Sequence, residues 1–263
     1  MSKTMVSELF YQRAFLGFSA LLFAASATVT IVWCASMSAM GEMPMPGGWT
    51  MSMAWMRMCG QTWPNAAASF IGMWVAMMVA MMLPSLTPML WHYRQAVGAR
   101  SDWLTALVGT GYFCVWAVLG AAAFVLGSAL SALEMQFPAL ARGAPVATGV
   151  VVLIAGALQF TSWKARRLAC CRSDSRCGGA MQADAATAWR HGLRLGLRCN
   201  SCCVGLTAIL LVMGVMDLRV MAAVTAAITA ERLAPAGDRA AKAIGAVVVV
   251  VGLILIARAM GLG

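Results

Sequence analysis

The sequence is poor in charged residues, which make up 11% of the chain, against about a quarter of an ordinary soluble protein. A soluble fold of 263 residues could not cover its surface with so few charges, whereas a lipid bilayer accepts an apolar surface. Hydrophobic residues account for 62% of the chain, and the mean hydropathy is +0.81. The composition therefore excludes a soluble globular domain and indicates an integral membrane protein in contact with the lipid bilayer.

Several functional signatures are also missing. The chain has no nucleotide-binding P-loop, no phosphorylated-aspartate ATPase motif, no Rossmann glycine pattern and no Ser-His-Asp set. The two histidines, His92 and His191, are expected on the same side of the membrane, which argues against a transmembrane haem with two histidine ligands. We therefore expect neither catalysis nor energy coupling. The net charge of +10 is explained by basic cytoplasmic loops, so nucleic acid is not an expected partner.

Apolar stretches that can span the hydrocarbon core are spread over the whole chain, which predicts one all-α membrane domain of residues 1–263. A further apolar stretch, 201–233, is divided by Gly214, Asp217 and Arg219 into two expected helices of about 15 residues each. Asp217 is interpreted as a helix cap. The pattern predicts a polytopic bundle of about seven transmembrane helices, with the other five near 14–35, 68–91, 103–131, 146–163 and 242–260.

The distribution of basic residues predicts the orientation. With the N-terminus in the cytoplasm, the outer segments contain few of the 19 Lys and Arg residues, namely Arg57, Arg142, Arg219 and Arg258. This bias follows the positive-inside rule and places the C-terminus outside, in a bacterial inner membrane. Residues 36–66 are then an outer loop and 164–198 a basic, cysteine-containing inner loop. Within the inner loop, 184–198 is expected to form an amphipathic helix on the lipid headgroups.

The expected outer loop is rich in methionine, whose thioether is a soft, neutral ligand that tolerates an oxidising compartment. Such ligands favour Cu(I), and spacings such as M-x-M let neighbouring sulfurs converge on one ion. The alternative is a hydrophobic lid on the membrane surface, with Trp49, Trp55 and Trp63 as interfacial anchors. The candidate copper ligands are Met37, Met40, Met43, Met45, Met51, Met53, Met56 and Met58.

A second group of methionines lies in the apolar segment 68–91. On a helical wheel they share one half of the helix, and the group consists of Met73, Met77, Met78, Met81, Met82 and Met89. Met73, Met77 and Met81 follow one another at i, i+4 spacing, so their sulfurs can meet. Over these few residues the pattern resembles the thioether ring of Ctr-type copper transporters. The alternative is a methionine-packed interface between helices.

Two groups of cysteines are expected on the cytoplasmic side, where reducing conditions disfavour disulfides. Cys199, Cys202 and Cys203 open the fifth apolar segment, at a helix N-terminus that would favour thiolates. The preceding loop carries Cys170, Cys171 and Cys177. The pattern predicts a Cu(I) site or a closed tetrahedral Zn(II) site. Small buried residues at a helix boundary and a thiol redox pair are the alternatives.

The order of these motifs resembles a known bacterial family. W-x2-M-M-x2-M-M-x-P-x3-P begins at Trp74, W-R-x-G-x3-G-x2-C-x2-C-C begins at Trp189, and G-x-M-D-L-x2-M-A begins at Gly214. These motifs are similar to those of the predicted metal-binding integral membrane proteins, a domain of unknown function with some members labelled copper chaperones. The resemblance runs from about residue 68 to the C-terminus and implies metal binding. This chain differs in its Met-rich outer loop and in Glu231-Arg232, where relatives often have Glu-Lys; here the pair is interpreted as an interfacial ion pair.

The leading hypothesis is a copper-handling protein that exchanges Cu(I) with a copper donor or acceptor protein. The outer methionines would collect Cu(I), the segment from Met73 to Met89 would pass it on, and the cluster from Cys199 to Cys203 would accept or deliver it. The alternative is a non-catalytic accessory or assembly subunit of a membrane oxidase or monooxygenase complex, in which the methionines serve as packing.

The predicted orientation can be tested with reporter fusions. Alkaline phosphatase fused after Gly263 is expected to be active, because the positive-inside rule places this end outside. The same reporter inserted after Arg176 is expected to be inactive, and green fluorescent protein at that position to fluoresce. The reverse pattern at both positions would show that the orientation is inverted.

Overall fold

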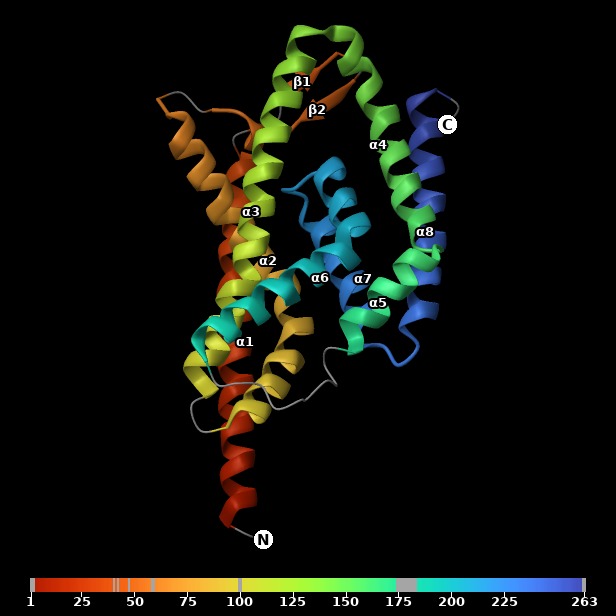
Figure 1. Cartoon of the computed structure of the whole chain (residues 1–263). Helices are drawn as coiled ribbons and strands as arrows, with labels where there is room; N and C mark the ends of the chain where they lie inside the picture. Colours follow the sequence, from red (N-terminus) through yellow and green to blue (C-terminus); the bar gives the residue numbers. More distant parts are fainter. Residues whose placement is uncertain are drawn as a thin grey trace.

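A computed structural model describes residues 3–39, 41, 43–46, 48–57, 60–98, 101–173 and 184–261. The described chain is predominantly helical, with one short two-stranded hairpin (Figure 1). The elements in order are α1 (Lys3–Ala39), β1 (Met43–Met45), β2 (Trp49–Met51), the 3-10 turn η1 (Met53–Trp55), α2 (Trp63–Val97), α3 (Ser101–Gln136), α4 (Pro138–Leu158), α5 (Ser162–Ser173), α6 (Ala185–Met213), α7 (Leu218–Leu233) and α8 (Gly237–Ala259).

Six of the described helices are long and apolar enough to cross a membrane, namely α1, α2, α3, α4, α6 and α8. The prediction of an all-α, polytopic membrane bundle is therefore confirmed. The remaining expected segment, the sixth in chain order, corresponds to α7, which has only 16 residues. The two ends of the chain lie at opposite ends of the bundle in Figure 1, as the predicted orientation requires. The number of crossings and the side on which each end lies remain predictions.

The described parts of the expected inner loop, 164–173 and 184–198, are helical almost throughout. It contains most of α5, and its last part belongs to α6, which continues without a break through the cysteines. Asp184 caps α6 by accepting a hydrogen bond from the Thr187 backbone N–H at 3.3 Å. The expected separate surface helix over 184–198 is therefore wrong. Cys199 lies about four turns inside α6 rather than at a helix N-terminus, so the helix dipole does not favour its thiolate.

The expected break between Gly214 and Asp217 is confirmed. Gly214 ends α6 with a positive φ of 127°, and Asp217 caps α7 by accepting hydrogen bonds from the backbone N–H groups of Arg219 and Val220. The helix before the break has 29 residues instead of about 15, because the amphipathic segment joins it. The short α7 packs against α2, α6 and α8.

Glycines set the distance between α3 and α6. A Cβ atom at Gly192 would clash with the backbone carbonyl of Val108, and one at Gly196 would lie 2.9 Å from the carbonyl oxygen of Tyr112. The G-x3-G spacing therefore lets the two backbones approach, as at many helix contacts in membranes. Because of this approach, residues of α3 and α6 beyond the glycines also come into contact.

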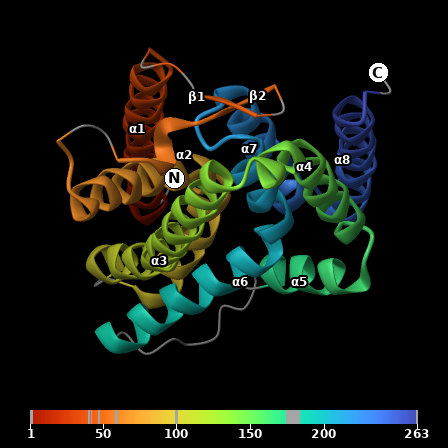
Figure 2. The ribbon, with the colours of Figure 1, turned by 90° about the horizontal axis from the view of Figure 1, so that it is seen from above.

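The same device joins α4 to α8, which lie side by side at one edge of the bundle (Figure 2). Gly149 and Gly252 leave room for Ile256 and Leu153 on the opposite helix, respectively. At the other edge, α1 contacts α2. The helix α2 lies between these two edges of the bundle and is the most buried of the six apolar spans. Its methionine half, predicted from the helical wheel, faces the core, where Met73, Met77, Met78, Met81, Met82 and Met89 are all buried.

Alanine substitutions along α6 test the role of the close contact. Gly192→Ala and Gly196→Ala are each expected to lower the free energy of unfolding by roughly 1–3 kcal/mol, because the added methyl group meets backbone atoms of α3 that cannot move aside. Gly205→Ala is the matched control, since its Cβ would make only ordinary contacts, the nearest at 3.5 Å. Thermal unfolding in detergent measures all three, and equal melting temperatures would contradict the expectation.

Candidate functional site

Three thiols meet on one face of α6. Cys199 and Cys203 are one helical turn apart, and their Sγ atoms are separated by 4.0 Å. The Sγ of Cys202 lies 3.5 Å from that of Cys203. All three side chains are buried, with exposed fractions of 1%. The motif C-x2-C-C therefore places its sulfurs together inside the bundle, as the sequence predicted.

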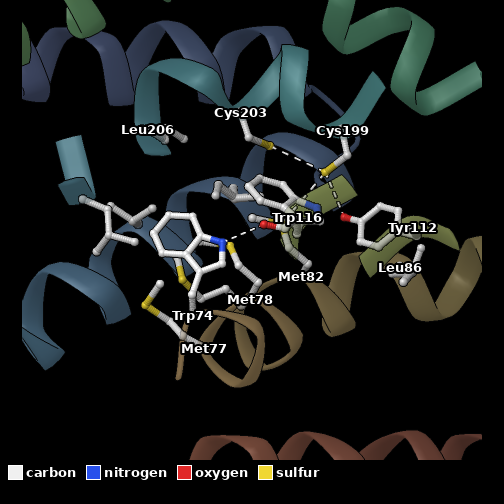
Figure 3. Packing of buried hydrophobic residues seen from close by; sticks show 14 of the residues in the cluster. Trp74, Met77, Met78, Met82, Leu86, Tyr112, Trp116, Cys199, Cys203 and Leu206 are labelled. Atoms are coloured by element: carbon white, nitrogen blue, oxygen red, sulfur yellow. Dashed lines mark hydrogen bonds between the residues drawn. The ribbon is translucent and has the colours of Figure 1, made fainter. Parts of the chain in front are cut away.

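The thiol of Cys199 is the point at which several helices converge (Figure 3). The hydroxyl of Tyr112 on α3 donates a hydrogen bond to Cys199 Sγ at 2.9 Å. The Sδ of Met82 on α2 lies 3.9 Å from the same sulfur. The contact with Tyr112 follows from the close approach of α3 and α6 at Gly196, whose space is limited by the Tyr112 carbonyl.

Arg232 on α7 reaches into the same cluster. Its Nη1 donates hydrogen bonds to Ser85 Oγ at 2.9 Å and to Cys199 Sγ at 3.1 Å. Its Nη2 lies 3.3 Å from Met89 Sδ. The side chain is buried, so its charge acts in a medium of low dielectric constant. The sequence-based interpretation of Glu231 and Arg232 as an interfacial ion pair is therefore wrong, since the guanidinium turns toward the cysteines.

Glu231 instead pairs with Lys164 from α5. The ammonium of Lys164 lies 2.7 Å from Glu231 Oε2 and donates a second hydrogen bond, at 2.6 Å, to the backbone carbonyl of Cys202. Both side chains are buried, and the backbone carbonyl of Glu231 also accepts a hydrogen bond from Arg172. This ion pair fastens α5 and α7 to the cysteine-bearing turn of α6.

Cys171 and Cys202 bring the two predicted cysteine groups into contact. Cys171 Sγ is hydrogen-bonded to Cys202 and donates a hydrogen bond to the Arg198 carbonyl at 3.2 Å. The shared hydrogen bond with Cys202 and, second, burial raise the pKa of the Cys171 thiol above its ordinary value. Cys170 is only half-buried, and Cys177 lies outside the described residues.

Around Cys199 Sγ, the thiol of Cys203 and the thioether of Met82 complete a soft donor set suited to Cu(I). The zinc prediction has less support. In the part of the chain that the structure covers, no group of three or more His, Cys, Asp or Glu side chains is arranged to hold a metal ion. A closed tetrahedral zinc site would need four such ligands in position.

Met73, Met77 and Met81, the predicted ligands on α2, are buried in the same core as the cysteines. The methionines whose sulfurs reach the site are instead Met82 and Met89. With Ser85 these two occupy positions i, i+3 and i+7 of α2, a stripe that the sequence displays. The wheel shows which half of the helix is buried, but it does not show which turn of α2 faces α6.

Several methionines of the expected outer loop pack against one another and against α4 in the residues that the structure describes. Met45 on β1 and Met51 on β2 are buried against Ala141. The Ala141 carbonyl accepts a hydrogen bond from Trp49 Nε1 at 2.7 Å. Met43 pairs with Met51 across the hairpin. Partly buried positions are held by Met37, Met43, Met53 and Met56, while Met40 and Met58 lie outside the described residues. These contacts fit the lid alternative, and metal binding by the loop remains a prediction.

Another thiol–thioether contact lies far along the sequence from the cysteine motif. Cys34 on α1 is buried, and its Sγ lies 4.0 Å from Sδ of Met216, in the turn between α6 and α7. The sequence does not predict this contact, nor the roles of Tyr112, Ser85 and Lys164. Each of these contacts joins helices that are distant in sequence, so no local spacing of residues predicts it.

The Lys164–Glu231 pair gives a stability prediction. Lys164→Met is expected to lower the free energy of unfolding by roughly 3–5 kcal/mol, because it leaves the buried Glu231 carboxylate unpaired. The double variant Lys164→Met/Glu231→Gln is expected to regain most of this loss. Asp102→Asn removes an ion pair with Arg94 whose carboxylate is exposed and should cost less than about 1 kcal/mol. Unfolding in detergent measures all three variants, and a double variant no more stable than the single one would contradict the pairing.

Comparison with known proteins adds one finding to this geometry. A protein-family model, PpoB2, described as copper chaperone, matches residues 71–255, which include the cysteine motif and its partners on α2, α3, α5 and α7. No significant match was found among curated proteins or solved structures. The match covers more than half of the chain and agrees with the family resemblance seen in the motifs, so the chain belongs to this copper-chaperone family.

Proposed function

We propose that the protein binds Cu(I) inside the membrane through Cys199, Cys203 and Met82, and passes it to or from a partner protein. The observation that supports this most strongly is the convergence on one sulfur. Cys199 Sγ lies 4.0 Å from Cys203 Sγ and 3.9 Å from Met82 Sδ. These separations are close enough for one ion of Cu(I) to bridge the sulfurs after small side-chain movements. Thiolate and thioether ligands are those that Cu(I) prefers.

The surroundings of the sulfurs also support a bound cation that has lost its water. The cysteines are buried among apolar side chains such as Trp74, Trp116 and Leu206 (Figure 3). A soft, weakly hydrated ion loses little by entering such a site when sulfur replaces water. The family description, copper chaperone, points to the same cargo. A bacterial inner membrane is the proposed location, because its reducing cytoplasmic side keeps the thiols available.

The path of the ion belongs to the proposal. The outer methionines would collect Cu(I), and Met73, Met77 and Met81 would lie between the lid and the cysteines along α2. The buried methionine face of α2 supports this order, since the face continues from Met73 to Met89, which lies beside Arg232. The sequence has no energy-coupling motif, so the ion would move by exchange between ligands. The role is non-catalytic, and Cys199 and Cys202 of the C-x-x-C motif form no redox pair in this scheme.

Metal content tests the proposal. Full-length protein is purified anaerobically in detergent from copper-supplemented cells, and its copper and zinc are measured by mass spectrometry. Near-stoichiometric copper is expected in the parent, and little in Cys199→Ser/Cys203→Ser, because the two thiolates are lost. Met82→Leu is expected to retain copper with weaker affinity. Cys114→Ser on α3, which changes a half-buried cysteine, is the matched control and should bind as the parent does.

Two further variants test the proposed path of the ion. Replacing the outer methionines by leucine should slow copper loading while leaving the affinity of the cysteine site unchanged. Met73→Leu/Met77→Leu/Met81→Leu should do the same.

A metal-free parent that co-purifies with an oxidase or monooxygenase would favour the accessory-subunit function, in which the methionines are packing. Disulfide exchange that Cys202→Ser abolishes without changing metal content would favour a thiol oxidoreductase.

A further inference from the structure

The charges buried near the cysteines do not balance. The structure describes three buried charged side chains at this level of the bundle, Lys164, Glu231 and Arg232. Lys164 and Glu231 neutralise each other at 2.7 Å. Within the described residues, Arg232 has no carboxylate within ion-pairing distance, and its hydrogen-bond partners are a hydroxyl and two sulfurs. One positive charge is therefore left beside the thiols.

This uncompensated cation is costly unless the site supplies negative charge. An unpaired charge in a membrane interior is unfavourable, and such residues usually mark functional sites. A guanidinium cannot give up its proton under ordinary conditions, so the charge of Arg232 is fixed. Its Nη1 lies only 3.1 Å from Cys199 Sγ, a sulfur of the proposed copper site. Any ion held by that sulfur must therefore bind close to a permanent positive charge.

The charge of the bound ion decides whether the site becomes neutral. Two thiolates, from Cys199 and Cys203, with one monovalent ion carry a net charge of minus one, which Arg232 cancels. The same thiolates with a divalent ion are neutral, so the charge of Arg232 remains without compensation. In a buried site this difference is large because little solvent screens it.

The hydrogen bonds around the sulfurs act in the same direction. Cys199 Sγ accepts hydrogen bonds from both Tyr112 and Arg232, and Nη2 of Arg232 donates a hydrogen bond to Met89 Sδ. Lone pairs engaged in this way are less available to a metal. Cys199 therefore has fewer lone pairs to share with a metal, which favours an ion with a low coordination number over a tetrahedral one.

We propose that Arg232 is a fixed countercharge that makes the cysteine site accept a monovalent soft cation in preference to a divalent one. This inference rests on the proposed function and adds the residue that sets its selectivity. Arg232 is a positioning and selectivity residue, since it touches the ligand sulfur and not the ion.

Metal affinities of the parent provide the first test. Reduced full-length protein in detergent is dialysed anaerobically against buffered Cu(I), Ag(I), Zn(II) and Cd(II). Ag(I) and Cd(II) both bind thiolates well and differ in charge, so they separate charge from softness. The parent is expected to bind Cu(I) and Ag(I) at the cysteines and to bind Cd(II) and Zn(II) much more weakly.

Substitution at Arg232 provides the second test. In Arg232→Met, which keeps an unbranched side chain and removes its charge, the affinity for Cu(I) and Ag(I) should fall roughly a hundredfold while that for Cd(II) rises. Arg232→Lys keeps the charge and should keep the preference for monovalent ions. Arg219→Met is the matched control, because it makes the same change at the exposed end of the same helix and should leave all four affinities unchanged.

The outcomes separate the two proposals. A parent that binds neither Cu(I) nor Ag(I) overturns both the copper site and the selectivity inference. A parent that binds Cu(I) and also binds Cd(II) as tightly as Ag(I) overturns the inference alone. The inference also falls if Arg232→Met weakens monovalent and divalent ions by the same factor. If Arg232→Met does not fold, the comparison of Ag(I) with Cd(II) in the parent and in Arg232→Lys decides the question.

Discussion

Close backbone contact between α3 and α6 is the constraint on which the rest of the site depends. Lipid tails are as apolar as leucine side chains, so helices in a bilayer associate through packing and polar contacts rather than through burial from water. Gly192 and Gly196 remove the side chains that would separate α3 from α6. One turn beyond Gly196, this approach places Cys199 beside the Tyr112 hydroxyl. Without this close approach, the Tyr112 hydroxyl would not reach Cys199, and the cysteines would lack their partner on α3.

Polar contacts between helices add to the close packing that the glycines allow. The helix α7 is too short to cross the hydrocarbon core in the usual way, and its C-terminal end is held by the Lys164–Glu231 pair and by the hydrogen bonds of Arg232. These contacts join α2, α5, α6 and α7 at one level of the bundle. In a medium of low dielectric constant each such contact is strong, and each unpaired member is costly. The site is therefore held by buried polar contacts from four helices as well as by packing.

Much of the fold follows from the sequence, because lipid imposes simple rules on length and charge. The apolar spans, the break at Gly214 and the buried methionine half of α2 could all be read from local pattern. The course of 164–198 was harder to predict, because an amphipathic helix can lie on the headgroups or continue into the next span. The pattern of charges alone does not decide between these two arrangements.

The site itself was predicted only in part. The spacing of Cys199, Cys202 and Cys203 was enough to bring their sulfurs together, since that geometry lies within one helix. The partners come from other helices, and Glu231 is 67 residues from Lys164, so only the packed bundle reveals which groups meet. Adjacent residues also have different surroundings, as Glu231 faces α5 while Arg232 faces α2 and α6. For the same reason Met82 and Met89, and not Met73, lie beside Cys199 and Arg232.

The complete burial of Cys199, Cys202 and Cys203 has a kinetic consequence. Water does not reach these sulfurs, so an ion bound to them in the proposed function would leave by associative exchange, one sulfur replacing another. Dissociation into solvent would be slow even if the equilibrium affinity were modest. Residence time would then be set by whichever incoming ligand can approach between α2, α6 and α7. The cargo would be kinetically protected in transit and released only on contact with a competent acceptor.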